Sequence, residues 1–369
     1  MAGLRDCGGN TVKWQGMNRE LSIALDLSRI LAAGVVFVSH ASWQAHTGGL
    51  FWQLGGVGRE AVDVFFVLSG FVIAHVTAER ERTARDFAVN RAARIASVAV
   101  PALLATVLLD AVGQAAMPGL YADLCCENSL TVVWRYIRNL FFIGDIWSQH
   151  VPPGTNVPWW SLGFEAWYYL AFGLFVFIPK PWNWGAAAAA LVVAGPGIAV
   201  LFPLWLLGGV GYRVSRRWAP GMWVGAALVA GAGVLVPLVI VFGPREGQIY
   251  AAFSWAPGRL LDYGQDYVIG SLFLCILLGV HGLSEVLARV FGAIERPVRW
   301  LAGGTFTLYL FHLPLMRALV AVSPWPADNW GVRGLVLFGV PLLVLGIAEV
   351  TERKKAFWRN GLRKLVGGA

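Results

Sequence analysis

Apolar stretches that approach membrane-spanning length recur along the whole chain and are separated by short polar segments. A helix that crosses the ~30 Å hydrocarbon layer of a bilayer needs about 20 residues. We therefore predict about ten spanning helices, near residues 21–42, 57–78, 95–113, 158–178, 184–200, 201–214, 219–242, 264–282, 300–322 and 332–350. The stretches at 184–200 and 201–214 are short and rich in Gly and Pro, so a broken pair or a re-entrant element is expected there.

The composition agrees with a membrane protein. Of the 369 residues, 57% are hydrophobic and only 14% are charged, whereas a soluble domain carries about 25% charged residues. These values argue against a water-soluble enzyme and predict an all-α integral membrane protein, which we assign to the cell inner membrane. The formal net charge of +8 could suggest nucleic-acid binding. No basic segment with interleaved aromatic residues is present, so we expect no nucleic-acid partner.

The distribution of Lys and Arg predicts the orientation in the membrane. With the N-terminus inside, about three times as many basic residues fall on the inner side as on the outer side, which favours cytoplasmic termini and an even number of spans. We divide the chain into a cytoplasmic segment (1–20), a membrane domain (21–350) and a basic cytoplasmic tail (351–369). The first twenty residues are polar, so no cleavable signal peptide is expected, and no fused domain is expected after residue 350.

Two other features of the sequence affect the choice of chemistry. The four Cys residues include the adjacent Cys125 and Cys126, but there is no CxxC pair and no His at zinc-ligand spacing, so no metal site is expected. The longest outer segment, residues 114–157, is long enough either to cover a site or to act as a plain connector.

Ionisable side chains inside an apolar span are costly, and the first span contains Asp26, Arg29 and His40. Arg29 and His40 are eleven residues apart, so they share a helix face but differ in depth by about 16 Å. Asp26 precedes Arg29 by three residues and is placed to pair with it. A structural ion pair and an interfacial histidine are the alternatives to a functional role.

Two more ionisable residues are expected at a depth similar to that of His40. If the span at 158–178 starts at the outer surface, Glu165 lies about 10 Å below it. His312, in the span at 300–322, lies about 12 Å below the same surface. Two histidines and a carboxylate would then converge, an arrangement suited to general-base catalysis because imidazole titrates near neutral pH. A buried polar network without chemistry is the alternative.

A pair of arginines marks the inner side. Arg91 and Arg94 lie one helical turn apart and are expected to face the same way, and guanidinium groups suit phosphate oxygens. Basic residues at inner helix ends are also ordinary in membrane proteins. A cationic inner mouth and a histidine-containing outer pocket suit an enzyme that takes an anionic cosubstrate from inside, but a transporter would also bury charges.

These residues resemble the motifs of a known family, the membrane-bound acyltransferase-3 family, over roughly residues 20–350. The similar blocks, in chain order, are Arg29 through His40, Val62-Asp63 through Ser69-Gly70-Phe71, Arg91 with Arg94, Trp160-Ser161-Leu162 through Glu165 to Tyr168, and Tyr309-Leu310-Phe311-His312 with Pro314. Ile30 and Trp167 depart from the family pattern at positions outside the proposed reactive groups.

The resemblance implies that an acyl group, usually acetyl, is transferred from cytoplasmic acyl-CoA to an acceptor hydroxyl. His40 would be the general base, and a route through an acyl-His40 intermediate is less parsimonious. Glu165 would either orient a histidine or bind the acceptor, and His312 would support the site. Arg29, paired with Asp26, would hold the donor or the geometry of the span.

The remaining motif residues are assigned to substrate binding by the same resemblance. Arg91 and Arg94 would bind the CoA phosphates, and Asp63, Ser69 and Tyr309 would line the substrate path. Acyl-CoA (acetyl-CoA) is then a cosubstrate, and no permanently bound cofactor is expected.

The partners implied are acyl-CoA, the lipid bilayer and an envelope glycan such as O-antigen or exopolysaccharide. A macrolide-like small molecule is an alternative acceptor. A transporter or exporter of an envelope precursor or small anion is the alternative class. Among the 18 Trp residues, Trp159, Trp160 and Trp325 could stack on sugars, although interfacial anchoring is the commoner use.

Overall fold

The computed structural model describes residues 17–122, 124, 128–242 and 263–367, and within these residues it is helical with no β-strand. Eight stretches are long and apolar enough to cross a membrane: α1 (Arg19–Ala41), α3 (Gly58–Glu79), α4 (Ala84–Ala116), α8 (Pro196–Arg217), α9 (Met222–Phe242), α11 (Gly264–Gly282), α13 (Thr305–Val322) and the continuous stretch Trp330–Leu365. The predicted Cys125–Cys126 feature lies outside the described residues. The fold class predicted from the sequence is confirmed.

Two predicted spans are weaker as membrane crossings. The helix α6 (Trp159–Phe177) is long enough but carries several polar and aromatic side chains. The helix α7 (Trp182–Ala194) has only 13 residues, whereas a full crossing needs about 20. The total of ten spans therefore stays a prediction. Within the described part of the chain, eight of the predicted spans are supported by their length and composition.

The broken pair forms at a different position from the one predicted. The chain turns at Gly195, between α7 and α8, and not near residue 200. Gly195 has a φ of +91°, a conformation that favours glycine. A Cβ atom there would lie 2.7 Å from the backbone nitrogen of Trp147, so the turn also depends on the close approach of a distant loop. Pro203, one of the residues behind the prediction, lies inside α8.

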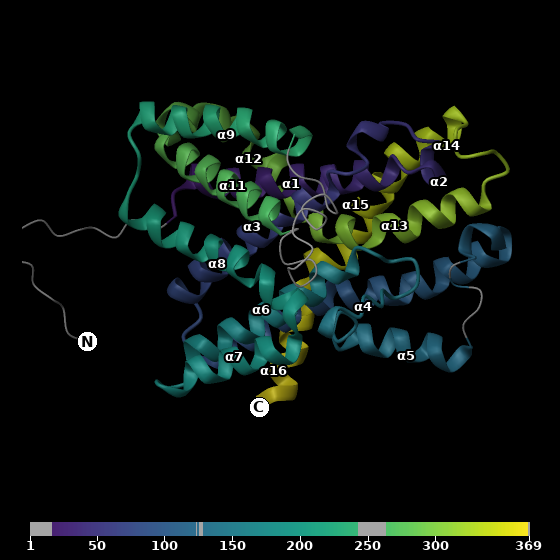
Figure 1. Cartoon of the computed structure of the whole chain (residues 1–369), viewed down its shortest axis with the longest axis horizontal. Coiled ribbons are helices and arrows are strands. Elements are labelled where there is room, and N and C mark those ends of the chain that lie inside the picture. Colours follow the sequence, from purple (N-terminus) through teal and green to yellow (C-terminus); the bar gives the residue numbers. More distant parts are fainter. Residues whose placement is uncertain (1–16, 123, 125–127, 243–262, 368–369) are drawn as a thin grey trace, which may run out of the picture.

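Helices α3 and α8 run side by side and pack closely (Figure 1). Glycines make this approach possible, because a Cβ on Gly70 would lie 1.8 Å from the carbonyl oxygen of Trp205. A Cβ on Gly208 would lie 2.0 Å from the carbonyl oxygen of Val67. Small residues at helix contacts are a common packing device in membranes, where helix association depends on van der Waals contact.

Shorter and amphipathic helices complete the described chain: α2 (Gln44–Thr47), η1 (Trp52–Leu54), η2 (Pro118–Tyr121), α5 (Ser129–Leu140), η3 (Ile146–Ser148) and α12 (Ser284–Ala302). The stretch Trp330–Leu365 consists of α14 (Trp330–Gly334), η5 (Leu335–Gly339), α15 (Val340–Val350), η6 (Glu352–Lys354) and most of α16 (Lys355–Gly367). The predicted span at 300–322 is shorter than expected because α12 ends at Ala302 and α13 begins at Thr305. The predicted basic tail forms α16, which packs on α4 with Arg363 placed 3.7 Å from Asp86.

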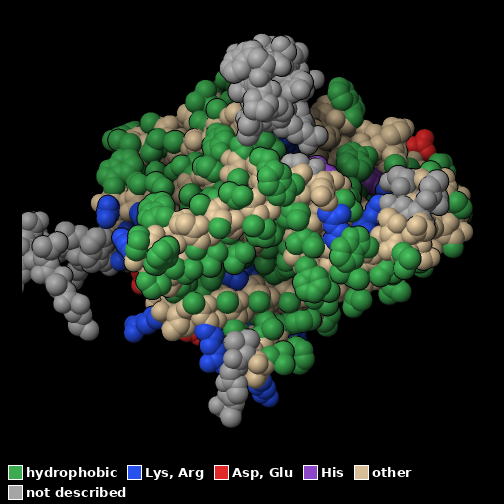
Figure 2. All heavy atoms as spheres, turned by 60° about the horizontal axis from the view of Figure 1, so that its bottom comes forward, with side chains coloured by type: hydrophobic (Ala, Val, Ile, Leu, Met, Phe, Trp, Pro, Cys, Tyr) green, Lys and Arg blue, Asp and Glu red, His purple; other side chains and the backbone are tan. Residues whose placement is uncertain are grey.

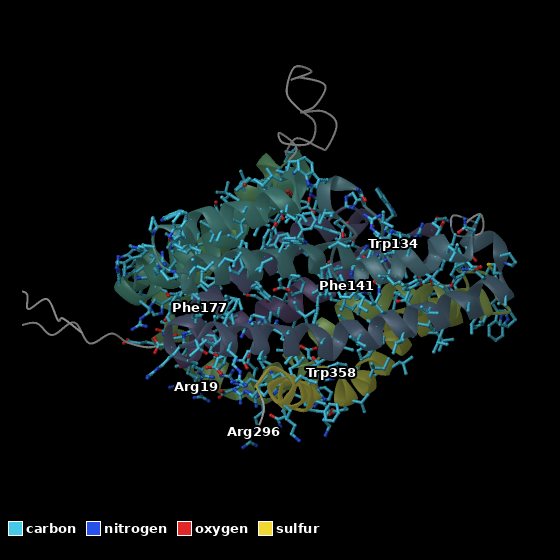
Figure 3. The ribbon with its side chains drawn as sticks, turned by 90° about the horizontal axis from the view of Figure 1, so that it is seen from below. Arg19, Trp134, Phe141, Phe177, Arg296 and Trp358 are labelled. Carbon is cyan, nitrogen blue, oxygen red and sulfur yellow. The ribbon has the colours of Figure 1, made fainter. Side chains whose placement is uncertain are left out.

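We call the end of the bundle where α3 ends and α4 begins the inner end, following the charge prediction. Arg19, Arg296 and Trp358 gather along one edge in Figure 3, and Trp134 and Phe141 lie away from it. Hydrophobic side chains cover most of the face seen in Figure 2, while most Lys and Arg side chains lie toward its left and lower edges. This separation is the one expected of a protein surrounded by lipid.

A loop from the opposite end inserts into the bundle. We call residues 141–158 the insertion segment. The Asn156 side chain, which is fully buried, donates to the carbonyl oxygen of Leu310 at 2.8 Å and to Thr106 at 3.2 Å. Thr155 donates to Asp110 through its backbone nitrogen at 2.9 Å. These contacts place the segment between α4 and α13, so α6, which follows it, begins inside the bundle.

Candidate active site

The two predicted histidines meet. His40, in the last turn of α1, and His312, fully buried on α13, place Nδ1 and Nε2 respectively 2.9 Å apart. The Nδ1 atom of His312 lies 2.9 Å from the carbonyl oxygen of Leu308. Since a carbonyl only accepts, His312 carries its proton on Nδ1 and accepts with Nε2. His40 therefore donates through Nδ1, which leaves its Nε2 with a lone pair.

His40 lines a cavity of about 570 Å³, which we call the outer cavity. Its polar and aromatic wall comes from several elements and includes His40, Trp43, Arg59, Asp145, His150 and Trp160. Of the three tryptophans considered for sugar stacking, Trp160 lies in this wall, whereas Trp159 is buried and Trp325 is exposed. A pocket of this size can accept a ligand as large as a typical small molecule.

The end of α1 is held by the short helix α2. The buried His46 places Nδ1 2.7 Å from the carbonyl oxygen of His40, and its ring stacks on Trp43 with centroids 5.5 Å apart. Burial lowers the pKa of His46 from its usual value of 6.5, because desolvation disfavours the charged form. His46 is thus neutral near pH 7 and serves as a fixed donor that positions the backbone of His40.

A second, narrower cavity of about 70 Å³ lies further toward the inner end, and we call it the inner cavity. Arg29, Ser69, Arg94 and Glu165 line it. Glu165 accepts hydrogen bonds from Ser69 and from Tyr169, each at 2.5 Å. This cavity combines two guanidinium groups with one carboxylate.

The predicted convergence of Glu165 with the two histidines is wrong. Ser161, one turn before Glu165, pairs with Tyr309 at 2.6 Å, and Tyr309 precedes His312 by three residues. Because α6 and α13 run in opposite directions, Glu165 lies further toward the inner end than His312. The prediction assumed that α6 begins at the outer surface, but the insertion segment moves its start into the bundle.

The two cavities share part of their wall, which we call the neck. Val62 on α3 and Tyr309 on α13 line both of them. Val62 is buried, and the Tyr309 hydroxyl is held by Ser161. The histidine pair and the cationic cavity therefore lie on opposite sides of one constriction.

The predicted ion pair in the first span is confirmed. Asp26 and Arg29 lie 3.1 Å apart, and Asp26 also pairs with Arg299 of α12 at 3.0 Å. The carboxylate is thus shared by two arginines, while Arg29 also lines the inner cavity.

The two arginines of α4 differ from each other. Arg94 lines the inner cavity as expected for a donor-binding residue. Arg91 instead forms an ion pair with the buried Glu81 at 2.8 Å, and its guanidinium lies 5.8 Å from the centre of the Tyr169 ring. The charge of Arg91 is therefore compensated by Glu81, Arg91 does not line the inner cavity, and its role in donor binding stays a prediction.

Asp63 does not reach the path between the cavities. It is buried on α3, one turn after Arg59, which pairs with Asp266 at 2.8 Å. Among the described residues, Asp63 lines neither cavity. The predicted substrate contact of Asp63 therefore stays a prediction, whereas Ser69 and Tyr309 do line a cavity.

Two wall residues of the outer cavity were missed by reading the sequence. The insertion segment contributes Asp145 and His150, whose Oδ1 and Nδ1 atoms lie 3.0 Å apart. They lie in a loop, where no helical period predicts depth. The available signal was a loop longer than usual that contains both a histidine and an aspartate.

The fold is that of a multi-span membrane protein with two cavities, one lined by His40 and the other by Arg29 and Arg94, which share the wall residues Val62 and Tyr309. The acyltransferase domain family, acyltransferase-3, matches residues 22–348. The chain belongs to this family and is a membrane acyltransferase, as the motifs of its first, second, fourth and ninth spans predicted.

Three relatives show what the chain is similar to. It is 22% identical to the acyltransferase MdmB of Streptomyces mycarofaciens, over 92% of this chain and 93% of that protein. It is 31% identical to the exopolysaccharide production protein ExoZ of Rhizobium meliloti, over 39% of this chain and 43% of that protein. It is 22% identical to the peptidoglycan O-acetyltransferase OatA of Listeria monocytogenes, over 92% of this chain and 57% of that protein. No solved structure matches the chain significantly.

Proposed function

We propose that the protein transfers an acyl group, with acetyl expected, from acyl-CoA at the inner end to a hydroxyl of an envelope glycan at the outer end. The observation that carries this proposal is that Val62 and Tyr309 line both cavities. The family and the relatives named for exopolysaccharide production and peptidoglycan O-acetylation support the choice of reaction and acceptor class.

The inner cavity suits the donor. Arg29 and Arg94 offer guanidinium groups to anionic oxygens. A cavity of about 70 Å³ is too small for the adenine nucleotide of CoA but could form part of a channel for its linear pantetheine arm. The nucleotide would stay toward the inner surface, and the thioester would reach the neck. Glu165, through Ser69 and Tyr169, would keep this polar wall in place.

The outer cavity suits the chemical step. In our proposal Nε2 of His40 removes the proton from the acceptor hydroxyl, and the oxygen attacks the thioester carbonyl carbon. The carbon–sulfur bond then breaks, the ester is formed, and the thiolate takes the proton from His40 to give free CoA. His312 accepts from Nδ1 of His40 throughout, which fixes the tautomer and stabilises the imidazolium.

The test is transfer by the purified full-length protein in sealed vesicles. Labelled acetyl-CoA is supplied on one side, surface glycan on the other, and thiol release and labelled ester are measured. His40→Ala should abolish both products while the protein stays folded, because the general base is lost. His75→Gln is the matched control, since His75 lines neither cavity, and it should retain full activity.

Two results would contradict the proposal. Near-normal ester formation by the His40→Ala variant would remove His40 from the role of general base. Movement of a glycan precursor or an anion across the vesicle without any thioester turnover would favour the transporter class.

A further inference from the structure

The outer cavity contains a second histidine–acid arrangement besides the His40–His312 pair. Asp145 is 5% exposed, and its carboxylate accepts from Nδ1 of His150 at 3.0 Å. The His150 side chain is about half exposed at the mouth of the same cavity. A buried carboxylate that holds one ring nitrogen leaves the other nitrogen, Nε2, available to a ligand.

The backbone around this pair is held in an unusual conformation. Phe142, Trp147 and His150 all have positive φ values, of 57°, 51° and 47°. Such residues cost free energy and cluster at functional sites. The loop is closed at its base, because Asn139 donates to the carbonyl oxygen of Val151 at 2.7 Å. The position of His150 is therefore set by the fold.

The rest of the wall indicates the chemical class of the ligand. Trp43, Trp160 and Tyr263 offer aromatic surfaces, and Arg59 adds a guanidinium group. Aromatic faces combined with a few oriented polar groups suit a ring that has apolar faces and a hydroxyl edge. A sugar has this character, whereas an acyl chain or a simple anion does not.

We propose that the Asp145–His150 pair is the acceptor-binding element, in which His150 hydrogen bonds a sugar hydroxyl and thereby places a neighbouring hydroxyl at His40. Asp145 is the positioning residue that orients His150. This assignment rests on the proposed function and names the residues that recognise its acceptor.

The experiment separates acceptor binding from donor use. Cells whose chromosomal copy carries His150→Ala are compared with the wild type, and their membranes are given labelled acetyl-CoA with their own surface glycan as the acceptor probe. We expect labelled ester on the glycan to fall about tenfold, the effect of losing one hydrogen bond to an oriented polar group. The apparent KM for acetyl-CoA should stay within about twofold, and His150→Gln should recover part of the transfer because an amide still hydrogen bonds.

A matched control tests whether the segment merely needs to stay folded. Gln149 is the adjacent residue, bonds Arg138 and does not line the cavity, so Gln149→Ala should transfer normally. Equal transfer by His150→Ala and Gln149→Ala would overturn the assignment, as would a labelled product that is not a carbohydrate.

Failure of the proposed function gives a different result. A wild-type strain that forms no labelled ester, or a His40→Ala strain that forms as much as the wild type, would overturn the proposed function and this assignment with it.

Discussion

At the scale of single residues, the two arginines of α4 differ in their surroundings. Arg91 is paired with the buried Glu81, and Arg94 lines the inner cavity three residues later. The spacing in the sequence correctly predicted that both arginines lie on one face of the helix. It could not predict the contact with Glu81, which lies outside the helix. A partner that lies in the loop before the helix is not part of the motif itself.

We expect the two arginines to respond differently to substitution. Arg94→Ala should raise the apparent KM for acetyl-CoA about tenfold or more, because a charge-assisted contact is lost. Arg91→Ala should instead lower the midpoint of thermal unfolding, because it leaves the Glu81 carboxylate buried without its partner. The measurements are donor titrations and unfolding in detergent. An equal rise of KM in both variants would contradict the distinction.

The histidine pair shows where reasoning from single residues works. Depth estimated from helix rise predicted that His40 and His312 lie close together, and the structure places them 2.9 Å apart. The same estimate failed for Glu165, because the depth of a residue can be calculated only if the depth at which its helix begins is known. That start is set by Asn156 and Thr155, whose hydrogen bonds to α4 and α13 leave no periodic signal in the sequence.

At the scale of elements, close packing of α3 on α8 fixes the wall that carries Val62 and Ser69. The approach depends on Gly70 and Gly208, where no side chain fits without displacing backbone atoms. The sequence predicted both helices, but not that they are neighbours. Neighbour relations between spans depend on surface shape, which the hydrophobic pattern does not encode.

We expect Gly70→Ala and Gly208→Ala each to destabilise the protein by about 1–3 kcal/mol, the usual cost of overpacking. Gly34→Ala is the control, since nothing lies within 4 Å of the added Cβ and Ala favours a helix. Thermal unfolding in detergent measures the difference. Wild-type stability of the Gly70→Ala variant would show that the two helices are not in close contact.

At the scale of the whole molecule, the arrangement places two cavities on either side of a constriction. The cavities on either side differ in size and charge, and Val62 and Tyr309 are common to both. The sequence predicted the all-α class, most of the spans and the opposite character of the two ends. It did not predict the insertion segment, which supplies Asp145 and His150, because the pattern of a loop does not reveal its depth.

Narrowing the constriction should block transfer without blocking donor binding. Val62→Phe adds an aromatic ring at the neck, and we expect the rate of ester formation to fall at least about tenfold while the KM for acetyl-CoA changes little. Val62→Ile, a smaller change, should have a smaller effect. Unchanged transfer by Val62→Phe, in a protein that still unfolds at the wild-type temperature, would mean that the acyl group does not pass this point.

The tightness of that constriction has a consequence for the cell. A polar passage open at both ends would let ions cross the membrane and would dissipate its electrochemical gradient. In the proposed function, the buried Val62 side chain and the hydroxyl pair of Tyr309 and Ser161 would close the path around the thin arm of the donor and keep protons and ions from crossing. After transfer, free CoA would then leave toward the inner end, where it can be acylated again.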